Sequence, residues 1–197
     1  MSLNDDVVIV SATRTPMGGF LGELSSVDAP QLGATAIEGA LKAAGINADD
    51  IEELAFGHVL SAGVGQAPAR QAALKAGLNK SMPCTGVSKV CGSGMKAVML
   101  AHDQIRAGSC QSMIAGGMES MSLAPYLMPK ARSGMRIGHC EMKDHMFLDG
   151  LEDAYTGRAM GTFAQDLANK YQLNREDMDA FALESLRRAN KAISDGN

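Results

Sequence analysis

Apolar residues follow two alternating patterns over the first 120 positions of the chain. Short apolar runs predict buried strands, and the stretches between them repeat apolar residues every three or four positions, which predicts helices. Val7–Val10 is a clear strand pattern, and Pro30–Ala44 is a clear helical pattern that Gly45 ends. The other predicted strands are Leu54–Leu60, Thr85–Val87 and Ser112–Ala115, and the other predicted helices are Ala67–Ala76 and Cys91–Ala107. Strands that alternate with helices indicate an α/β layered domain.

The pattern changes near Ser120. Residues 121–150 are rich in Met, Gly, Pro and charged residues and show no clear period, which is typical of loops. The helical period returns at Gly161, and a second helix is predicted over Arg175–Ile193, with Asn174 as its cap. We therefore expect a domain boundary near Ser120.

Composition and charge exclude several classes of protein. Of the 197 residues, 46% are hydrophobic, which is too many for an intrinsically disordered chain. The chain has 18 basic and 22 acidic residues and no basic run, so we expect neither a nucleic acid nor a membrane surface as its partner. No signal peptide and no apolar run of membrane-spanning length is visible, so we expect a cytoplasmic protein.

The four cysteines are potential nucleophiles, and Cys91 has the most informative position among them. It lies between a predicted short strand and the best predicted helix, where free N–H groups and the helix dipole favour a thiolate and can hold an oxyanion. Gly92 and Gly94 each cost about 1 kcal/mol in a helix, so we expect a ligand or another backbone to approach closely there. The residues alone leave two interpretations open, a nucleophilic Cys91 and a buried structural thiol.

Other motifs that carry chemistry are absent or incomplete. No Gly-x-Ser-x-Gly elbow is present in the right place, and Gly63–Pro68 has Pro where a dinucleotide-binding loop needs its third Gly. The chain contains no Trp, which argues against a papain-like cysteine protease.

The histidines do not predict a metal site. His139–Cys140 and Asp144–His145 match no zinc-binding spacing, and we expect an exposed loop there. His58 and His102 stand alone in the sequence, and we expect each to be a satisfied or half-buried histidine rather than a catalyst.

Several short motifs together resemble the thiolase family in their order and spacing over the whole chain. The motifs are Ser11–Pro16, Phe20–Gly22, Val90–Met95, Ala115–Ser122, Ala124–Tyr126, Met160–Thr162 and Asp179–Ala182. The resemblance implies a layered α-β-α-β-α fold of two similar halves, of which this chain is the first half. Residues 4–120 then form the N-terminal α/β half-domain without its final strand, and residues 121–197 begin a loop domain that covers the substrate.

The resemblance also implies an activity and its residues. Thiolases condense two acetyl-CoA molecules to acetoacetyl-CoA and CoA, or cleave 3-ketoacyl-CoA, through an acyl group on the cysteine that corresponds to Cys91. Leu151 and Met160 correspond to residues of the CoA pocket. The expected substrates are acyl-CoA thioesters in fatty acid metabolism, without a metal or a tightly bound cofactor, in a homodimer or homotetramer. Ketoacyl synthases are a related alternative, but their reactive-cysteine motif differs from Val90–Gly94.

Two residues and three motifs depart from the family pattern. Ser88 stands where an Asn is usual, and Ala159 stands where short-chain thiolases carry a His beside the acyl group, so we expect a pocket for somewhat longer acyl chains. The Asn-Glu-Ala, Gly-His-Pro and Cys-x-Gly-Gly motifs, which supply the activating His and the acid/base Cys in the family, do not occur in this sequence. The alternative interpretation is therefore a truncated thiolase fragment without turnover of its own.

Overall fold

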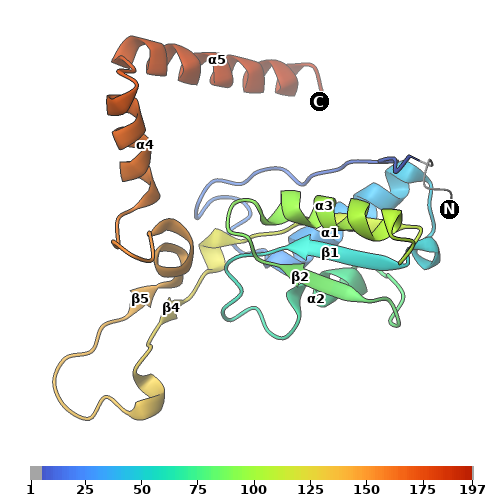
Figure 1. Cartoon of the computed structure of the whole chain (residues 1–197), viewed down its shortest axis with the longest axis horizontal. Coiled ribbons are helices and arrows are strands. Elements are labelled where there is room, and N and C mark those ends of the chain that lie inside the picture. Colours follow the sequence, from blue (N-terminus) through green and yellow to red (C-terminus); the bar gives the residue numbers. More distant parts are fainter. Residues whose placement is uncertain (1–5, 197) are drawn as a thin grey trace. The chain divides into compact units, whose positions relative to one another are not determined.

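A three-stranded parallel sheet is the centre of the first of two compact units. The computed structural model describes residues 6–196, and the chain passes from the first unit to the second after Gly150. The strands are β1 (Glu53–Gly57), β2 (Cys84–Val87) and β3 (Met113–Gly117), in the spatial order β2-β1-β3 (Figure 1). In this register Ala55 pairs with Thr85 on one side and with Ala115 on the other. Three of the four sequence-predicted strands are confirmed, with small shifts at their ends.

Helices cover both faces of this sheet. They are α1 (Ala29–Ala44), α2 (Pro68–Lys75) and α3 (Ser93–Arg106). Because side chains alternate along a strand, Leu54 and Phe56 of β1 enter the core with residues of α1 and α2. Gly57 faces the other way and lies against the first turn of α3. The result is a layered α/β arrangement, as the sequence predicted (Figure 1).

The ends of α1 show why the sequence signals were reliable there. The Asp28 carboxylate accepts a hydrogen bond of 2.7 Å from the Gln31 N–H and caps the first turn. Gly45 ends the helix in the left-handed conformation, with φ 66°. The predicted helix over Pro30–Ala44 is therefore confirmed almost to the residue.

The predicted buried strand at Val7–Val10 is wrong. The segment is extended but pairs with no strand, and Val8, Ile9 and Val10 are 70%, 80% and 64% exposed. Two side chains hold the following residues on α1, because the Ser11 and Thr13 hydroxyls donate to carbonyl oxygens of that helix. An apolar cavity of ≈ 470 Å³ separates residues 7–13 from β3. A β-branched run forms a strand only where a neighbour accepts its hydrogen bonds, and none of the described strands lies beside this run.

The buried face of α3 is made of small residues rather than of its large apolar ones. The helix buries Ser93, Ala97 and Ala101, whereas Met95 and Met99 are exposed. A Cβ added to Gly57 would lie 2.5 Å from the Gly94 nitrogen, so the helix runs too close to the sheet for large side chains. His102 is exposed, and its Nδ1 lies 3.1 Å from the Asp103 carboxylate, so it is satisfied rather than half-buried.

The segment from residue 121 to 150 is mostly irregular, as predicted, but it belongs to the first compact unit. Its short elements are η2 (Met121–Leu123), η3 (Ala131–Ser133) and the antiparallel pair β4 (Tyr126–Leu127) and β5 (Lys143–Asp144). The π-helical turn η4 (Phe147–Leu151) follows. The structure thus divides after Gly150, whereas the sequence predicted a boundary near Ser120. The assignment of residues 121–197 to a separate loop domain stays a prediction.

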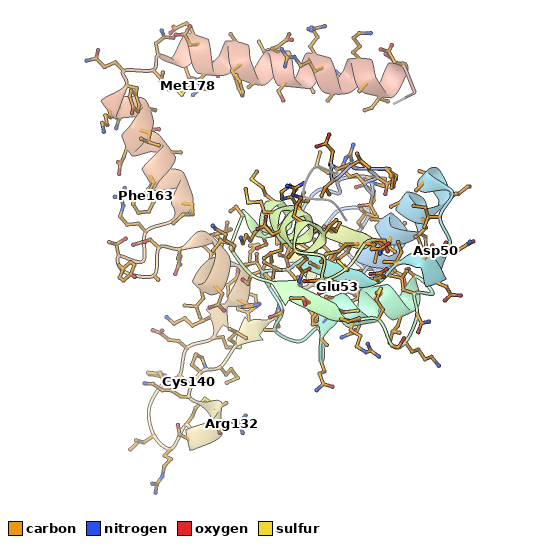
Figure 2. The ribbon with its side chains drawn as sticks, turned by 45° about the vertical axis from the view of Figure 1, so that its right-hand side comes forward. Asp50, Glu53, Arg132, Cys140, Phe163 and Met178 are labelled. Atoms are coloured by element: carbon orange, nitrogen blue, oxygen red, sulfur yellow. The ribbon has the colours of Figure 1, made fainter. Side chains whose placement is uncertain are left out.

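Two helices make up most of the second unit. They are α4 (Met160–Lys170) and α5 (Arg175–Ser194), and Asn174 caps α5 by accepting a hydrogen bond of 2.8 Å from the Asp177 N–H. Arg158 pairs with Asp166 and lies over the ring of Phe163, which Figure 2 labels on α4. Within residues 6–196, no helix combines the length and the apolar character that a membrane crossing requires.

Candidate active site

Cys91 occupies a sharp turn between β2 and α3, at the carboxyl edge of the parallel sheet. β2 ends at Val87 and α3 begins at Ser93. The sequence predicted Cys91 as the first residue of the helix, whereas the structure places it two residues before the helix. The thiol is exposed. Among the described residues, none accepts a hydrogen bond from the Cys91 backbone N–H. This N–H is therefore available to a ligand that meets the thiol.

The turn around Cys91 is tight and strained. The Gly92 and Ser93 N–H groups donate to the carbonyl oxygens of Lys89 and Val90, at 3.0 and 3.1 Å. Val90 has φ 47°, in the left-handed region that a β-branched residue rarely adopts. Such strain costs of order 1–3 kcal/mol and persists only where the surrounding contacts impose it. The residue directly before Cys91 is therefore held in an unfavourable conformation.

The glycine that this site needs most is Gly57. The sequence suggested that Gly92 and Gly94 allow a close approach, but a Cβ at Gly94 would be 3.7 Å from the Gly116 oxygen, an ordinary contact. A Cβ at Gly57 would lie 2.5 Å from the Gly94 nitrogen and 2.8 Å from the Ser93 Cβ. The first turn of α3 thus packs directly against the backbone of β1 at Gly57. This contact fixes the position of Cys91 relative to the edge of the sheet.

The other three cysteines are poorer nucleophile candidates. Burial raises the pKa of the Cys84 thiol, although Arg70 acts in the opposite direction. Burial likewise raises the pKa of Cys110, and the carboxylates of Glu53 and Glu52 add to the effect. Cys140 is exposed and lies on the loop between η3 and β5, where Figure 2 labels it, and no helix begins at it. Cys91 alone combines exposure with a helix N-terminus.

A carboxylate that the sequence analysis passed over lies at the same edge of the sheet. Glu119 follows β3 and accepts hydrogen bonds from the Val59 and Leu60 N–H groups, at 2.9 and 3.1 Å. Its Oε1 lies 3.2 Å from Nε2 of the buried His58. Burial pushes the pKa of Glu119 upward, but His58 and the two N–H groups outweigh it and leave this pKa below its ordinary value. The position of Glu119, two residues after a strand that ends in Gly-Gly, is the signal that could have identified it.

His145 is not the exposed loop residue that the sequence predicted. Its side chain is buried, and its Nδ1 lies 2.6 Å from the Asp149 carboxylate. Its Nε2 accepts a hydrogen bond of 3.3 Å from the Ala62 N–H. The contact ties residues 121–150 to the loop after β1. His139 and Cys140 are exposed as predicted, and the described residues include no group of three or more His, Cys, Asp or Glu side chains arranged to hold a metal ion.

The two predicted CoA-pocket residues lie in the second unit. Leu151 is partly buried at the end of η4, and Met160 is the exposed first residue of α4. Ala159 precedes that helix in the N-cap position. The roles of Leu151 and Met160 stay predictions.

The motif segments that lie far apart in the sequence meet in the first unit. The Leu21 N–H donates to the Ser122 hydroxyl at 2.9 Å, and the Ser120 hydroxyl donates to the Val27 oxygen at 2.8 Å. The fold and the site together define a layered α/β protein that presents a cysteine thiol at the carboxyl edge of a parallel sheet.

Comparison with known proteins identifies the family. A family model described as "Thiolase, N-terminal domain" matches residues 7–197. The chain therefore belongs to the thiolase family, as the motifs had indicated.

The relatives are consistent with this family. The chain is 51% identical to an acetyl-CoA acetyltransferase of Pseudomonas aeruginosa over 191 residues, which are 97% of this chain and 49% of that protein. It is 52% identical to acetyl-CoA acetyltransferase 2 of Arabidopsis thaliana over 183 residues, 93% of this chain and 45% of the relative. An acetyl-CoA acetyltransferase of Saccharomyces cerevisiae is 46% identical over 196 residues, 98% of this chain and 49% of the relative. The chain spans about half the length of these curated relatives.

Proposed function

We propose that this chain carries the acyl-accepting part of an acetyl-CoA C-acetyltransferase site, with Cys91 as the nucleophile. One observation carries the proposal: Cys91 is an exposed thiol on a strained turn at the sheet edge, and its own N–H is unoccupied among the described residues. The relatives are named acetyl-CoA acetyltransferases, which supports the choice of substrate.

The proposed chemistry proceeds through a thioester on Cys91. The Cys91 sulfur attacks the carbonyl carbon of acetyl-CoA, a new C–S bond forms, and the C–S bond to CoA breaks. The proton that Cys91 loses ends on the departing CoA thiol. The Cys91 N–H is placed to stabilise the oxyanion of the tetrahedral intermediate. A second acetyl-CoA then loses an α-proton, and its carbanion attacks the acetyl carbonyl carbon. A C–C bond forms, the C–S bond to Cys91 breaks, and acetoacetyl-CoA leaves while the α-proton ends on the Cys91 sulfur. The reverse sequence is thiolysis.

The described residues around Cys91 do not include the groups that would move these protons. The resemblance assigns the activating His and the acid/base Cys to motifs that this sequence does not contain. The alternative proposal is therefore a catalytically incomplete fragment, which accepts an acyl group at most once per chain.

The finer parts of the proposal concern the substrate and the assembly. We place Leu151 and Met160 in the CoA pocket, and we place Ala159 beside an acyl group slightly longer than acetyl. No tightly bound cofactor is needed, because the acyl-CoA thioester brings its own leaving group. We further propose a homodimer or homotetramer that acts in the cytoplasm in fatty acid metabolism.

Acetyl labelling tests the central assignment. The purified chain is incubated with radiolabelled acetyl-CoA, digested, and mapped by mass spectrometry. We expect the label on the Cys91 peptide and its loss in Cys91→Ser. The matched control is Cys140→Ser, which removes another exposed thiol and should leave the labelling unchanged. Label on Cys84, Cys110 or Cys140 with Cys91 unmodified would overturn the proposal.

A further inference from the structure

The hydroxyl of Ser93 links the two sides of the turn that carries Cys91. Ser93 is the first residue of α3 and is only 4% exposed. Its Oγ donates a hydrogen bond of 2.6 Å to the Val90 carbonyl oxygen and accepts one of 2.8 Å from the Lys89 N–H. Both partners precede Cys91 and Ser93 follows it, so one side chain closes a small ring around the nucleophile.

These bonds are not those of a helix cap. A capping hydroxyl accepts from an N–H group further along the helix, whereas the Ser93 hydroxyl bonds backwards, to the turn. The N-cap residue of α3 is Gly92, and no side chain caps it. The hydroxyl therefore restrains the turn rather than the helix.

The Ser93 hydroxyl restrains Val90, whose backbone conformation is unfavourable. Val90 is in the left-handed region, and its side chain is 51% exposed, so side-chain packing contributes little to holding it there. The Ser93 hydroxyl holds its carbonyl oxygen, and the Ser93 N–H reaches the same oxygen at 3.1 Å. Ser93 is in turn fixed on the sheet, because its Cβ lies over Gly57. The chain of contacts from Gly57 through Ser93 to Val90 thus sets the backbone direction into Cys91.

We propose that Ser93 is a positioning residue for acyl transfer to Cys91. Its hydroxyl keeps Val90 left-handed, so that the thiol and the Cys91 N–H stay together on the exposed side of the turn. Ser93 exchanges no proton with the substrate and touches none of the reacting atoms. The inference rests on the proposed function of Cys91 and adds the residue that fixes its geometry.

The test uses the whole 197-residue chain and two substitutions, Ser93→Ala and Val90→Asn. The first readout is the initial rate of acetyl transfer from acetyl-CoA to Cys91. The second is the rate of iodoacetamide labelling of Cys91 relative to the exposed Cys140, with the buried Cys110 as a reporter of unfolding. Ser93→Ala should lower the acetylation rate roughly tenfold, the effect of losing the two hydrogen bonds. It should also lower the Cys91 to Cys140 labelling ratio and leave Cys110 protected.

The rescue experiment separates positioning from a general structural role. Asn adopts the left-handed region more readily than Val, so Ser93→Ala combined with Val90→Asn should recover most of the lost rate. If Ser93→Ala exposes Cys110, the single substitutions at position 90 decide: Val90→Asn should react at least as fast as the wild type, and the β-branched control Val90→Ile should not exceed it. An unchanged rate in folded Ser93→Ala, or a Val90→Asn variant slower than Val90→Ile, overturns the proposal.

Failure of the acyl-transfer assignment and failure of the positioning role of Ser93 give different results. If the wild-type chain takes no acetyl group on Cys91, the acyl-transfer assignment fails. The iodoacetamide ratio still reports whether Ser93 sets the reactivity of Cys91. A ratio that Ser93→Ala leaves unchanged in a folded chain would then refute the positioning role by itself.

Discussion

His58 and Glu119 face each other across the carboxyl ends of β1 and β3, with 3.2 Å between His58 Nε2 and Glu119 Oε1. The Glu119 carboxylate also accepts hydrogen bonds from the N–H groups of Val59 and Leu60. Glu119 therefore fixes the loop that leaves β1, close to where Gly57 supports the turn of Cys91. A half-buried carboxylate that accepts several hydrogen bonds fixes the groups around it, and it loses these interactions when it is protonated.

Stability should depend on pH through Glu119. Its pKa is lowered in the folded chain, so its contribution is complete above the ordinary value of 4.5 and is lost as the pH falls through the folded pKa. At pH 7 we expect Glu119→Gln to lower the free energy of unfolding by about 1–3 kcal/mol. Below pH 4.5 the difference between variant and wild type should shrink. Urea titrations at several pH values and one fixed protein concentration measure both effects.

An exposed carboxylate provides the control for Glu119. The pKa of Glu141 is also lowered, by a hydrogen bond from Lys143, but Glu141 is exposed to solvent. Because exposed ion pairs contribute little, Glu141→Gln should barely alter unfolding at any pH. Equal effects of Glu119→Gln and Glu141→Gln would show that the partial burial of Glu119 and its hydrogen bonds are unimportant for stability.

Gly57→Ala should disturb both stability and Cys91. The new Cβ would lie within 2.6 Å of two backbone atoms of α3, so the helix or the end of β1 has to shift. We expect a loss of about 1–3 kcal/mol in the free energy of unfolding, the usual cost of overpacking, and slower acetylation of Cys91. Gly86→Ala on β2 is the matched control, since no atom lies within 4 Å of its Cβ position. A Gly57→Ala chain as stable as Gly86→Ala would contradict this close contact.

Local signals in the sequence were sufficient for the three paired strands, the helices and the position of Cys91 just before α3. Gly45, Asn174 and the apolar runs at β1 and β3 act through neighbours in the chain, so their effects can be predicted without the fold. The remaining features depend on partners far away in sequence. His145 is buried because it meets the Ala62 N–H, and Glu119 is an anchor because β1 and β3 are adjacent.

Two departures from the sequence pattern have the same kind of cause. The pattern of Val7–Val10 describes its own residues, but pairing depends on a neighbouring strand. The large apolar residues of α3 repeat at helical spacing, but the close approach at Gly57 allows only small side chains on its buried face. In both cases tertiary contacts outweighed a correct local period.

The 197-residue chain should accept acetyl groups without turning over. A complete cycle needs a base for the α-proton of the second acetyl-CoA, and the motifs that provide it in the family are absent from this sequence. We expect at most one acetyl group per chain, transferred slowly, and no steady release of acetoacetyl-CoA. The measurement compares acetyl-enzyme formed with product formed over time. Sustained thiolysis of acetoacetyl-CoA by the purified chain, abolished in Cys91→Ser, would disprove this expectation.

The chain should also self-associate through the exposed apolar segment at its start. Val8, Ile9 and Val10 border the ≈ 470 Å³ apolar cavity beside β3, and β3 has no described strand on its outer edge. Unpaired strand edges next to exposed apolar residues promote association between copies. We therefore expect concentration-dependent oligomers in sedimentation experiments.

A charged substitution identifies the surface that associates. Ile9→Lys places a charge on a side chain that is 80% exposed, so it should weaken association without altering the circular dichroism spectrum. Tyr155→Lys is the matched control, because it also replaces an exposed apolar side chain by Lys, in the second unit. It should leave the oligomers intact. If the wild-type chain stays monomeric over the whole concentration range, or if Tyr155→Lys alone dissociates it, the apolar border of the cavity is not the associating surface.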